Sequence, residues 1–232
     1  MFQTLLKGPL DEEQAAAMVQ QNEALGRLRL GLVAGARLLR DPNDTQQVFY
    51  LARAFDHGTL ERLRGTLLQT QAGRSLLARR PAIDRASVDF EMLRSLPEHT
   101  LGGAYARMLD RNHLTPDVFK RPPGLPDELA WIAQRVRQTH DVWHALTGLD
   151  SDVVGEIALQ AFTYGQLQLR LSCAIMVFGV VFYGLRYPQV FRLAWRWYRE
   201  GRKAALLLSV AWEDRWDEPL NQVRRNVGLS CV

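Results

Sequence analysis

Apolar residues recur at helical spacing along almost the whole chain, and this pattern limits the possible folds more than any other feature. Runs that alternate apolar and polar residues between hairpin turns, which would indicate strands, are absent from the sequence. The chain has 232 residues, enough to bury one sizeable core. We therefore predict an all-α fold, in which residues 1–232 form a single-domain helical bundle.

Prolines and glycines divide the helical pattern into segments. We expect helices at about 11–40, 43–56, 58–70, 73–79, 100–112, 187–209 and 214–227. Residues 80–98 contain Pro81 and Pro97 and predict a loop with room for one short helix. The four prolines between Asn112 and Glu128 predict a second connecting loop.

A helical hairpin is expected in the middle of the chain. Its first helix begins at Pro126 or Asp127 and ends before Gly148, which suits a left-handed cap. Its second helix begins at Asp150 or Ser151. Residues at the end of the first helix can therefore face residues in the first turns of the second.

This hairpin carries the one pattern that indicates chemistry more than packing. His140 and His144 are four residues apart and share one face of the first helix, with Asp141 about 60° around the axis from His144. Glu156 follows the break and can reach back across the hairpin. Because such a His-x-x-x-His pair also occurs by chance in many helices, a purely structural role stays open.

The nitrogen and oxygen donors of His140, Asp141, His144 and Glu156 predict a site for one divalent metal ion. Zinc is our first choice, and iron, manganese or magnesium are alternatives. Asp141 is the candidate catalytic residue, although it could instead accept a hydrogen bond that orients a histidine.

The overall charge points to no particular class of partner. The chain has 29 basic and 25 acidic residues, and this small excess comes without any nucleic-acid-binding motif, so nucleic acid is not an expected partner. Cys173 and Cys231 are far apart, which suits free thiols in a reducing compartment. The early acidic run Asp11–Glu13 and the lack of an apolar signal core predict a bacterial protein without a targeting leader.

The longest apolar run extends from Leu171 to Leu185 between Arg170 and Arg186. It is shorter than the roughly 20 residues that a membrane-spanning helix needs, so we expect any membrane contact to be peripheral. A helix that is apolar all round is most simply a core helix, but it could also line a lipid groove or form a partner surface. The candidate residues for a lipid or substrate groove are Arg170, Met176, Phe178, Phe182 and Arg186.

A basic stripe follows at helical spacing, and aromatic residues flank it. The stripe consists of Arg192, Arg196, Arg199 and Lys203, and the aromatic residues are Trp195, Trp197 and Tyr198. This pattern suits a helix on an anionic membrane surface. A solvated charged face with its aromatic residues in the core is the slightly favoured alternative.

The hairpin motif also carries a family resemblance. The sequence His140-Asp141-Val142-Trp143-His144 with Glu156 resembles the His-Asp-x-x-His-x11-Glu hallmark of the ubiquinone (coenzyme Q) biosynthesis family, the family of the fourth coenzyme Q biosynthesis protein. Further matches are Gly73–Leu77, Pro81, Leu96–Gly102, Tyr105, Gly201-Arg202, Trp212-Glu213, Trp216–Leu220 and Arg224. The resemblance implies an all-helical, metal-binding protein of quinone biosynthesis at a membrane surface.

The resemblance also implies a choice between two roles. The first is oxidative decarboxylation, meaning decarboxylation plus hydroxylation, at ring C1 of a polyprenylated hydroxybenzoate. The second is a non-catalytic scaffold that binds prenyl lipid and organises other ubiquinone-biosynthesis proteins. A metal-dependent phosphohydrolase is less expected, because only His57, His99 and His113 remain as further histidine ligands.

These roles set the expected partners and location. The expected partners are a polyprenylated quinone precursor, other ubiquinone-biosynthesis proteins and an anionic membrane surface, and a homodimer is possible. The expected location is the bacterial cytoplasm, peripheral on the inner face of the cytoplasmic membrane.

Overall fold

The computed structural model describes residues 14–15, 17, 23–40, 46–118, 121–122 and 124–229. Every regular element in this part of the chain is a helix, and its one β-type pairing is an isolated bridge between Thr100 and Pro219. The predicted all-α fold is therefore confirmed.

The α-helices are α3 (Glu23–Arg40), α4 (Gln46–Phe55), α5 (His57–Leu68), α6 (Gln71–Arg79), α7 (Phe90–Ser95), α8 (Leu101–Arg111), α9 (Asp127–Thr147), α10 (Val153–Leu167), α11 (Arg170–Tyr183), α12 (Gln189–Lys203) and α13 (Leu220–Asn226). Short 3-10 turns are η1 (Pro116–Val118), η2 (Leu207–Ser209) and η3 (Trp212–Asp214). The short helix allowed for in the 80–98 loop is α7. The beginning of the helix predicted at 11–40 lies largely outside the described residues.

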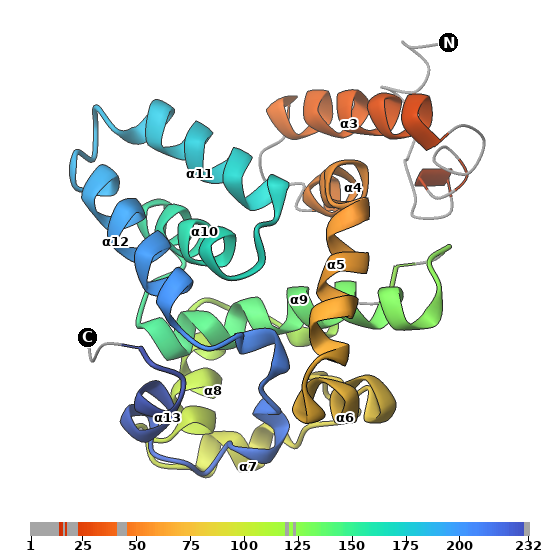
Figure 1. Ribbon diagram of the computed structural model, residues 1–232. Helices are drawn as coiled ribbons and strands as arrows, with labels where there is room; N and C mark the ends of the chain where they lie inside the picture. Colours follow the sequence, from red (N-terminus) through yellow and green to blue (C-terminus); the bar gives the residue numbers. More distant parts are fainter. Residues whose placement is uncertain are drawn as a thin grey trace.

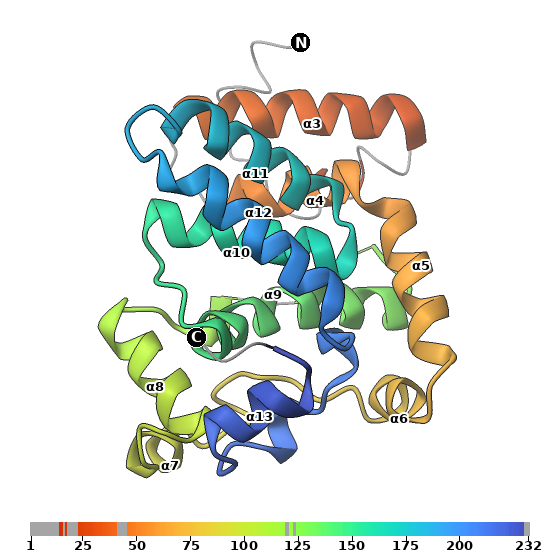
Figure 2. The same ribbon diagram turned by 60° about the vertical axis from the view of Figure 1, so that its left-hand side comes forward.

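Helix α9 crosses the middle of the molecule (Figure 1). Helices α3, α4, α10, α11 and α12 lie on one side of it, and α6, α7, α8 and α13 lie on the other, as the turned view also shows (Figure 2). Trp131, Trp143 and Leu146 of α9 are fully buried or nearly so. Trp143 packs edge to face on Phe162 of α10, with ring centroids 5.8 Å apart. The hairpin that carries the motif is thus held in the centre of the fold.

The C-terminal segment is less helical than predicted. Helix α12 ends at Lys203 and not near residue 209, because Ala204 is extended and the Ala205 N–H pairs with the Val227 carbonyl. Only Leu220–Asn226 of the predicted helix at 214–227 forms an α-helix. The preceding residues instead accept backbone hydrogen bonds from the N-terminus of α8, which satisfy two of its free N–H groups.

The apolar run at 171–185 does not form a core helix, so the favoured interpretation was wrong. Gln168 adopts a left-handed conformation (φ 51°) that ends α10, and α11 begins as a separate helix at Arg170. The Asp56 carboxylate accepts the backbone N–H groups of Arg170 and Leu171, at 2.6 and 3.2 Å. Within α11 only Leu171 and Ser172 are buried.

None of the described helices is both long and apolar enough to cross a membrane.

Candidate metal centre and cavity

The end of α9 and the start of α10 are fixed by local capping. Gly148 takes the left-handed conformation (φ 72°) and donates its N–H to the His144 carbonyl, which terminates α9. Asp152 caps α10 by accepting the Gly155 N–H at 2.7 Å. These caps place the last turn of α9 beside the first turn of α10.

Gly155 is required by a close approach within this turn. A Cβ atom at this position would lie 2.0 Å from the Asp150 carbonyl oxygen, a distance that no side chain tolerates. Glu156 follows in the first turn of α10, where the positive end of the helix dipole favours a carboxylate.

Three predicted ligands converge at this point. One donor atom from each of His140, His144 and Glu156 lies within 4.8 Å of the other two. His144 Nε2 is 2.9 Å from Glu156 Oε1, and His140 Nε2 is 3.5 Å from Glu156 Oε2. Donor atoms around one tetrahedral zinc ion are roughly 3.3 Å apart, so only small side-chain movements would bring all three to a single cation.

A backbone carbonyl on the Nδ1 side of the ring, away from Glu156, fixes the orientation of His144. Its Nδ1 lies 2.9 Å from the Leu149 carbonyl oxygen, which can only accept, so Nδ1 carries the hydrogen. Nε2 lies 2.9 Å from Glu156 Oε1, so it donates to the carboxylate when it carries a proton and offers its lone pair to a cation once that proton is lost. A backbone carbonyl behind a histidine in this way is the usual second partner of a metal-ligating imidazole. The donor set therefore fits a divalent metal.

Charges within the cluster shift the pKa values of its members in opposite directions. Burial alone would lower the pKa of His140, but its hydrogen bond to Glu156 and the negative charge there outweigh this effect, so the pKa is raised. Burial would raise the pKa of Glu156, but hydrogen bonds from both histidines hold it well below the ordinary value. The cluster is thus a carboxylate hydrogen-bonded to imidazoles, and a metal cation can replace the protons that these hydrogen bonds contain.

Asp141 does not belong to this cluster. As the residue after His140 it points roughly 100° away around α9, and its buried side chain lines the neighbouring cavity. Burial raises the pKa of its carboxyl group, and the nearby charge of Glu156 adds to this. The hydroxyl of Tyr105 is also buried, without a hydrogen-bond partner among the described residues, and the charge of Asp141 adds to burial in raising its pKa.

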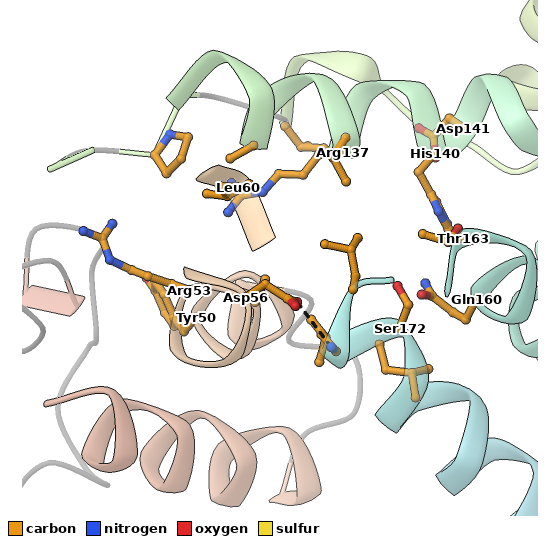
Figure 3. Close-up of a pocket in the computed structure, with 18 of the residues that line it drawn as sticks. Tyr50, Arg53, Asp56, Leu60, Arg137, His140, Asp141, Gln160, Thr163 and Ser172 are labelled. Atoms are coloured by element: carbon orange, nitrogen blue, oxygen red, sulfur yellow. Dashed lines mark hydrogen bonds between the residues drawn. The ribbon is translucent and has the colours of Figure 1, made fainter. Parts of the chain in front are cut away.

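A cavity of about 700 Å³ opens beside the cluster, within the size range of small-molecule sites. In Figure 3, His140, Asp141 and Thr163 lie at one end of this cavity, and Tyr50 and Arg53 lie at the other. Apolar side chains from α5, α9 and the start of α11 form much of the wall between the two ends, namely Leu60, Val136, Leu169, Leu171 and Ile175.

The residues predicted for a lipid or substrate groove lie outside this cavity. None of Arg170, Met176, Phe178, Phe182 and Arg186 lines the cavity. Phe178 and Phe182 are 62% and 72% exposed and lie in the second half of α11. The first turns of the same helix supply Leu171, Ser172 and Ile175 to the cavity instead.

Several polar cavity residues were not predicted, although helical spacing could have indicated some of them. Arg137 precedes His140 by three residues, and Gln160 and Thr163 follow Glu156 by four and seven, so each pair shares a helix face. Arg53 comes from α4 and Asp56 from the junction of α4 and α5, both far away in sequence, and no local pattern connects them to the motif.

Comparisons with known proteins agree with this arrangement. A family model described as "Coenzyme Q (ubiquinone) biosynthesis protein Coq4" matches residues 18–232. The mitochondrial ubiquinone biosynthesis protein COQ4 homolog of Homo sapiens is 33% identical over 212 residues, which cover 88% of this chain and 79% of the relative. Its Bos taurus counterpart is 32% identical over 211 residues, 89% of this chain and 79% of the relative.

The fold is also found in a solved structure. A crystal structure from Nostoc punctiforme PCC 73102, named as a ubiquinone biosynthesis protein, superposes with a TM-score of 0.69 and 27% identity and covers 87% of this chain and 97% of that one. The helical fold, the His140–His144–Glu156 cluster and the match along nearly the whole chain lead to one conclusion: the chain belongs to the Coq4 family of ubiquinone biosynthesis proteins.

Proposed function

We propose that this protein binds one divalent metal ion, zinc being the first choice, and uses it in the oxidative decarboxylation of a polyprenylated hydroxybenzoate at ring C1. The observation that carries the proposal is the position of the His140–His144–Glu156 cluster at the wall of a large, mostly apolar cavity. One end of this cavity offers charged and polar groups for an aromatic acid, and its walls offer apolar surface for a prenyl chain.

His140, His144 and Glu156 would hold the metal, and the Leu149 carbonyl would keep His144 in the ligating orientation. A divalent ion supplies a positive centre that binds and polarises a carboxylate. With three protein ligands, a coordination position remains for the substrate, as in catalytic zinc sites. The overall change replaces the ring carboxylate by hydroxyl and releases carbon dioxide. This is a two-electron oxidation of the substrate, for which we name dioxygen as the oxidant: the acid, dioxygen and water give the hydroxylated ring, carbon dioxide and hydrogen peroxide, which carries the two electrons.

Asp141 is the residue that we propose for proton transfer. Its buried carboxyl group lines the cavity beside the cluster, and its raised pKa lets it hold a proton closer to neutral pH than an exposed aspartate does. We expect Asp141→Asn to retain bound metal and to lower turnover by roughly 10²- to 10⁴-fold. Loss of the metal in this variant would instead make Asp141 part of the ligand set.

The metal assignment is tested by elemental analysis of the purified protein after loading with zinc. We expect His144→Ala and Glu156→Ala to lose the bound metal. His99→Ala, which removes an exposed histidine outside the cluster, serves as the matched control and should keep it. Equal metal content in all three variants would reject the site.

The activity is tested with substrate labelled in the carboxyl carbon. Metal-loaded protein, a prenylated hydroxybenzoate and dioxygen should yield labelled carbon dioxide and the hydroxylated ring in equal amounts. Protein carrying Glu156→Ala should yield neither. Absence of both products with metal and substrate bound would reject the catalytic role.

The apolar cavity also favours a second function, that of a prenyl-lipid-binding scaffold for other ubiquinone-biosynthesis proteins. A scaffold would bind the precursor equally well with and without the metal, and would release no carbon dioxide. In either role we place the protein at the inner face of the bacterial cytoplasmic membrane, because its prenylated substrate would be membrane-dissolved.

A further inference from the structure

The outer face of α11 and α12 exposes more large apolar side chains than a surface helix of a globular protein normally does. On α11 these are Val177, Phe178, Val181, Phe182 and Tyr183, and the turn and α12 add Leu185, Phe191 and Trp195. Leu185 is 96% exposed and Trp195 is 63% exposed. We call these eight residues the apolar face. Contiguous exposed apolar surface of this kind marks an interaction site.

The two helices present this face together. Exposed residues on α11 recur at spacings of one, three and four, so they lie on one side of the helix, as do Phe191 and Trp195 of α12. The two sides meet at the turn, where a Cβ on Gly184 would lie 2.5 Å from the Phe191 ring. In both views α11 lies at the end of the molecule away from α7, and α12 runs from there toward the middle (Figure 1, Figure 2).

Basic residues border the apolar face. Arg192, Arg196 and Arg199 are exposed on α12, and Arg186 is exposed at the turn. The sequence contains no aspartate or glutamate between Glu156 and Glu200. Glu200 itself is mostly buried and pairs with Lys203 at 3.4 Å. The exposed charges that α11, the turn and α12 themselves contribute up to Arg199 are therefore all positive.

This charge pattern selects the partner. In a two-fold dimer the same patch meets itself, so a uniform positive rim around an apolar centre would bring like charges together. An anionic bilayer offers the opposite arrangement, with hydrocarbon for the aromatic side chains and negative headgroups for the arginines. Tryptophan and tyrosine at such a border suit the headgroup level.

We propose that the apolar face and its basic rim form the surface with which this protein docks on an anionic lipid bilayer, with α11 and α12 lying in the membrane interface. The slightly favoured interpretation of the α12 stripe predicted a solvated charged face with the aromatic residues in the core. The basic residues of the stripe are exposed and Trp197 is buried, as that interpretation expected, but Trp195 is exposed beside them. This proposal rests on the membrane location proposed above and names the surface that would produce it. It does not depend on the metal chemistry.

Vesicle sedimentation tests the proposal with the full chain. The vesicles contain phosphatidylcholine alone or with about 30% phosphatidylglycerol, which supplies the negative surface. We expect the protein to bind the anionic vesicles more strongly. Arg192→Gln with Arg196→Gln should weaken that binding roughly 25-fold, since each basic residue near an anionic surface contributes about fivefold. Phe178→Ser with Phe182→Ser should weaken it roughly a hundredfold, through lost apolar burial.

Matched controls carry the same kinds of change at the opposite end of the molecule. Met92→Ser removes an exposed apolar side chain on α7, and Arg225→Gln removes an exposed charge on α13. Both should bind vesicles like the unchanged protein. His144→Ala should also bind normally, which separates a failure of docking from a failure of the metal site.

Trp195 gives a direct readout of contact. The other five tryptophans are at most 7% exposed, so a blue shift on vesicle addition and quenching by brominated lipid should come from Trp195. Trp195→Phe should abolish both signals. Equal binding to neutral and anionic vesicles, or equal binding by all variants, would overturn the proposal. If the Phe178 and Phe182 changes dissociate a dimer without altering vesicle binding, a second copy covers the face and the membrane assignment is wrong.

Discussion

Two consecutive helical hairpins of this protein differ in which side chains they bury and which they expose. The α9–α10 hairpin brings charged groups into the interior, where hydrogen-bond partners hold two of them: His144 contacts the Leu149 carbonyl and Glu156, and Arg135 donates to Glu213. The α11–α12 hairpin places apolar side chains outside, where no described residue covers them.

The difference shows how the fold divides its functions. Buried charge is costly unless it is paired, so the first hairpin holds its groups in a fixed geometry suited to chemistry. Exposed apolar surface costs the fold little but leaves free energy to be gained on contact with another apolar phase. The following changes should affect the first hairpin strongly and the second hardly at all.

The largest loss of stability is expected from Glu213→Ala. Arg135 is fully buried and donates to Glu213 at 2.6 Å and to the Val210 carbonyl at 2.7 Å. Removal of the carboxylate leaves an unpaired buried guanidinium, which should lower the free energy of unfolding by about 3–5 kcal/mol. Urea denaturation measures this value.

The exposed ion pair of Arg94 with Asp110 provides the control for that experiment. Asp110→Ala should cost at most about 1 kcal/mol, because solvent screens this pair. Equal losses in the two variants would show that the Arg135 pair contributes no more than a surface contact.

Gly155→Ala should have the next largest effect. The added methyl group would collide with the Asp150 carbonyl, so the turn before Glu156 must shift, at a cost of roughly 1–3 kcal/mol. Metal affinity should fall as well, because Glu156 moves with the turn. Gly65→Ala in α5, where a Cβ meets nothing within 4 Å, should instead be neutral or stabilising. A stable Gly155→Ala variant with full metal affinity would contradict the role assigned to this turn.

Metal affinity should depend on pH through His140. Its raised pKa means that the metal-free protein carries a proton there even somewhat above the ordinary histidine range, and metal binding must release it. Affinity for zinc should therefore fall roughly tenfold per unit as the pH drops below this raised pKa. Glu156 stays ionised in this window, because its pKa is lowered.

The stability of the metal-free protein should change with pH in the opposite direction: it should fall, not rise, as the pH increases. The raised pKa of His140 contributes stability below the ordinary histidine pKa, and this contribution is lost as the pH rises through the raised value. Competition with a chelator and thermal unfolding across this range measure the two trends. A zinc affinity that does not change with pH would show that His140 binds no proton in the free site.

The smallest effect is expected from Phe178→Ser and Phe182→Ser on the isolated protein. Both side chains are mainly exposed, so the free energy of unfolding should change by no more than about 0.5 kcal/mol each. Phe162→Ala, which empties a fully buried site between Trp143 and Trp197, should cost about 3–5 kcal/mol. A large loss from the α11 changes would mean that this helix packs more tightly than its exposure indicates.

The centre of the fold was largely predictable from the sequence. Gly148 marked the end of α9, helical spacing paired His140 with His144, and the break before Glu156 indicated a hairpin that could bring the three together. Asp141 was grouped with them although an adjacent residue on a helix points away from its neighbour.

The parts that could not be predicted depend on tertiary contacts. The break between α10 and α11 rests on Gln168 in a left-handed conformation and on the Asp56 carboxylate, contributed from more than a hundred positions earlier in the chain. The exposure of α11 could not be predicted from the sequence, for a different reason. A helix that is apolar on all sides has no periodicity that distinguishes inside from outside.

The position of helix α11 also bears on how a prenylated ligand could enter the cavity. Its first turns form part of the cavity wall through Leu171, Ser172 and Ile175, and its later turns carry the exposed Phe178 and Phe182. Leu171, Ile175, Phe178 and Phe182 follow one another at helical spacing, so one apolar stripe along α11 leads from the chamber to the proposed hydrocarbon phase. A long isoprenoid tail would follow this stripe from one hydrocarbon environment to the other, so its loading would avoid the large penalty of extraction into water.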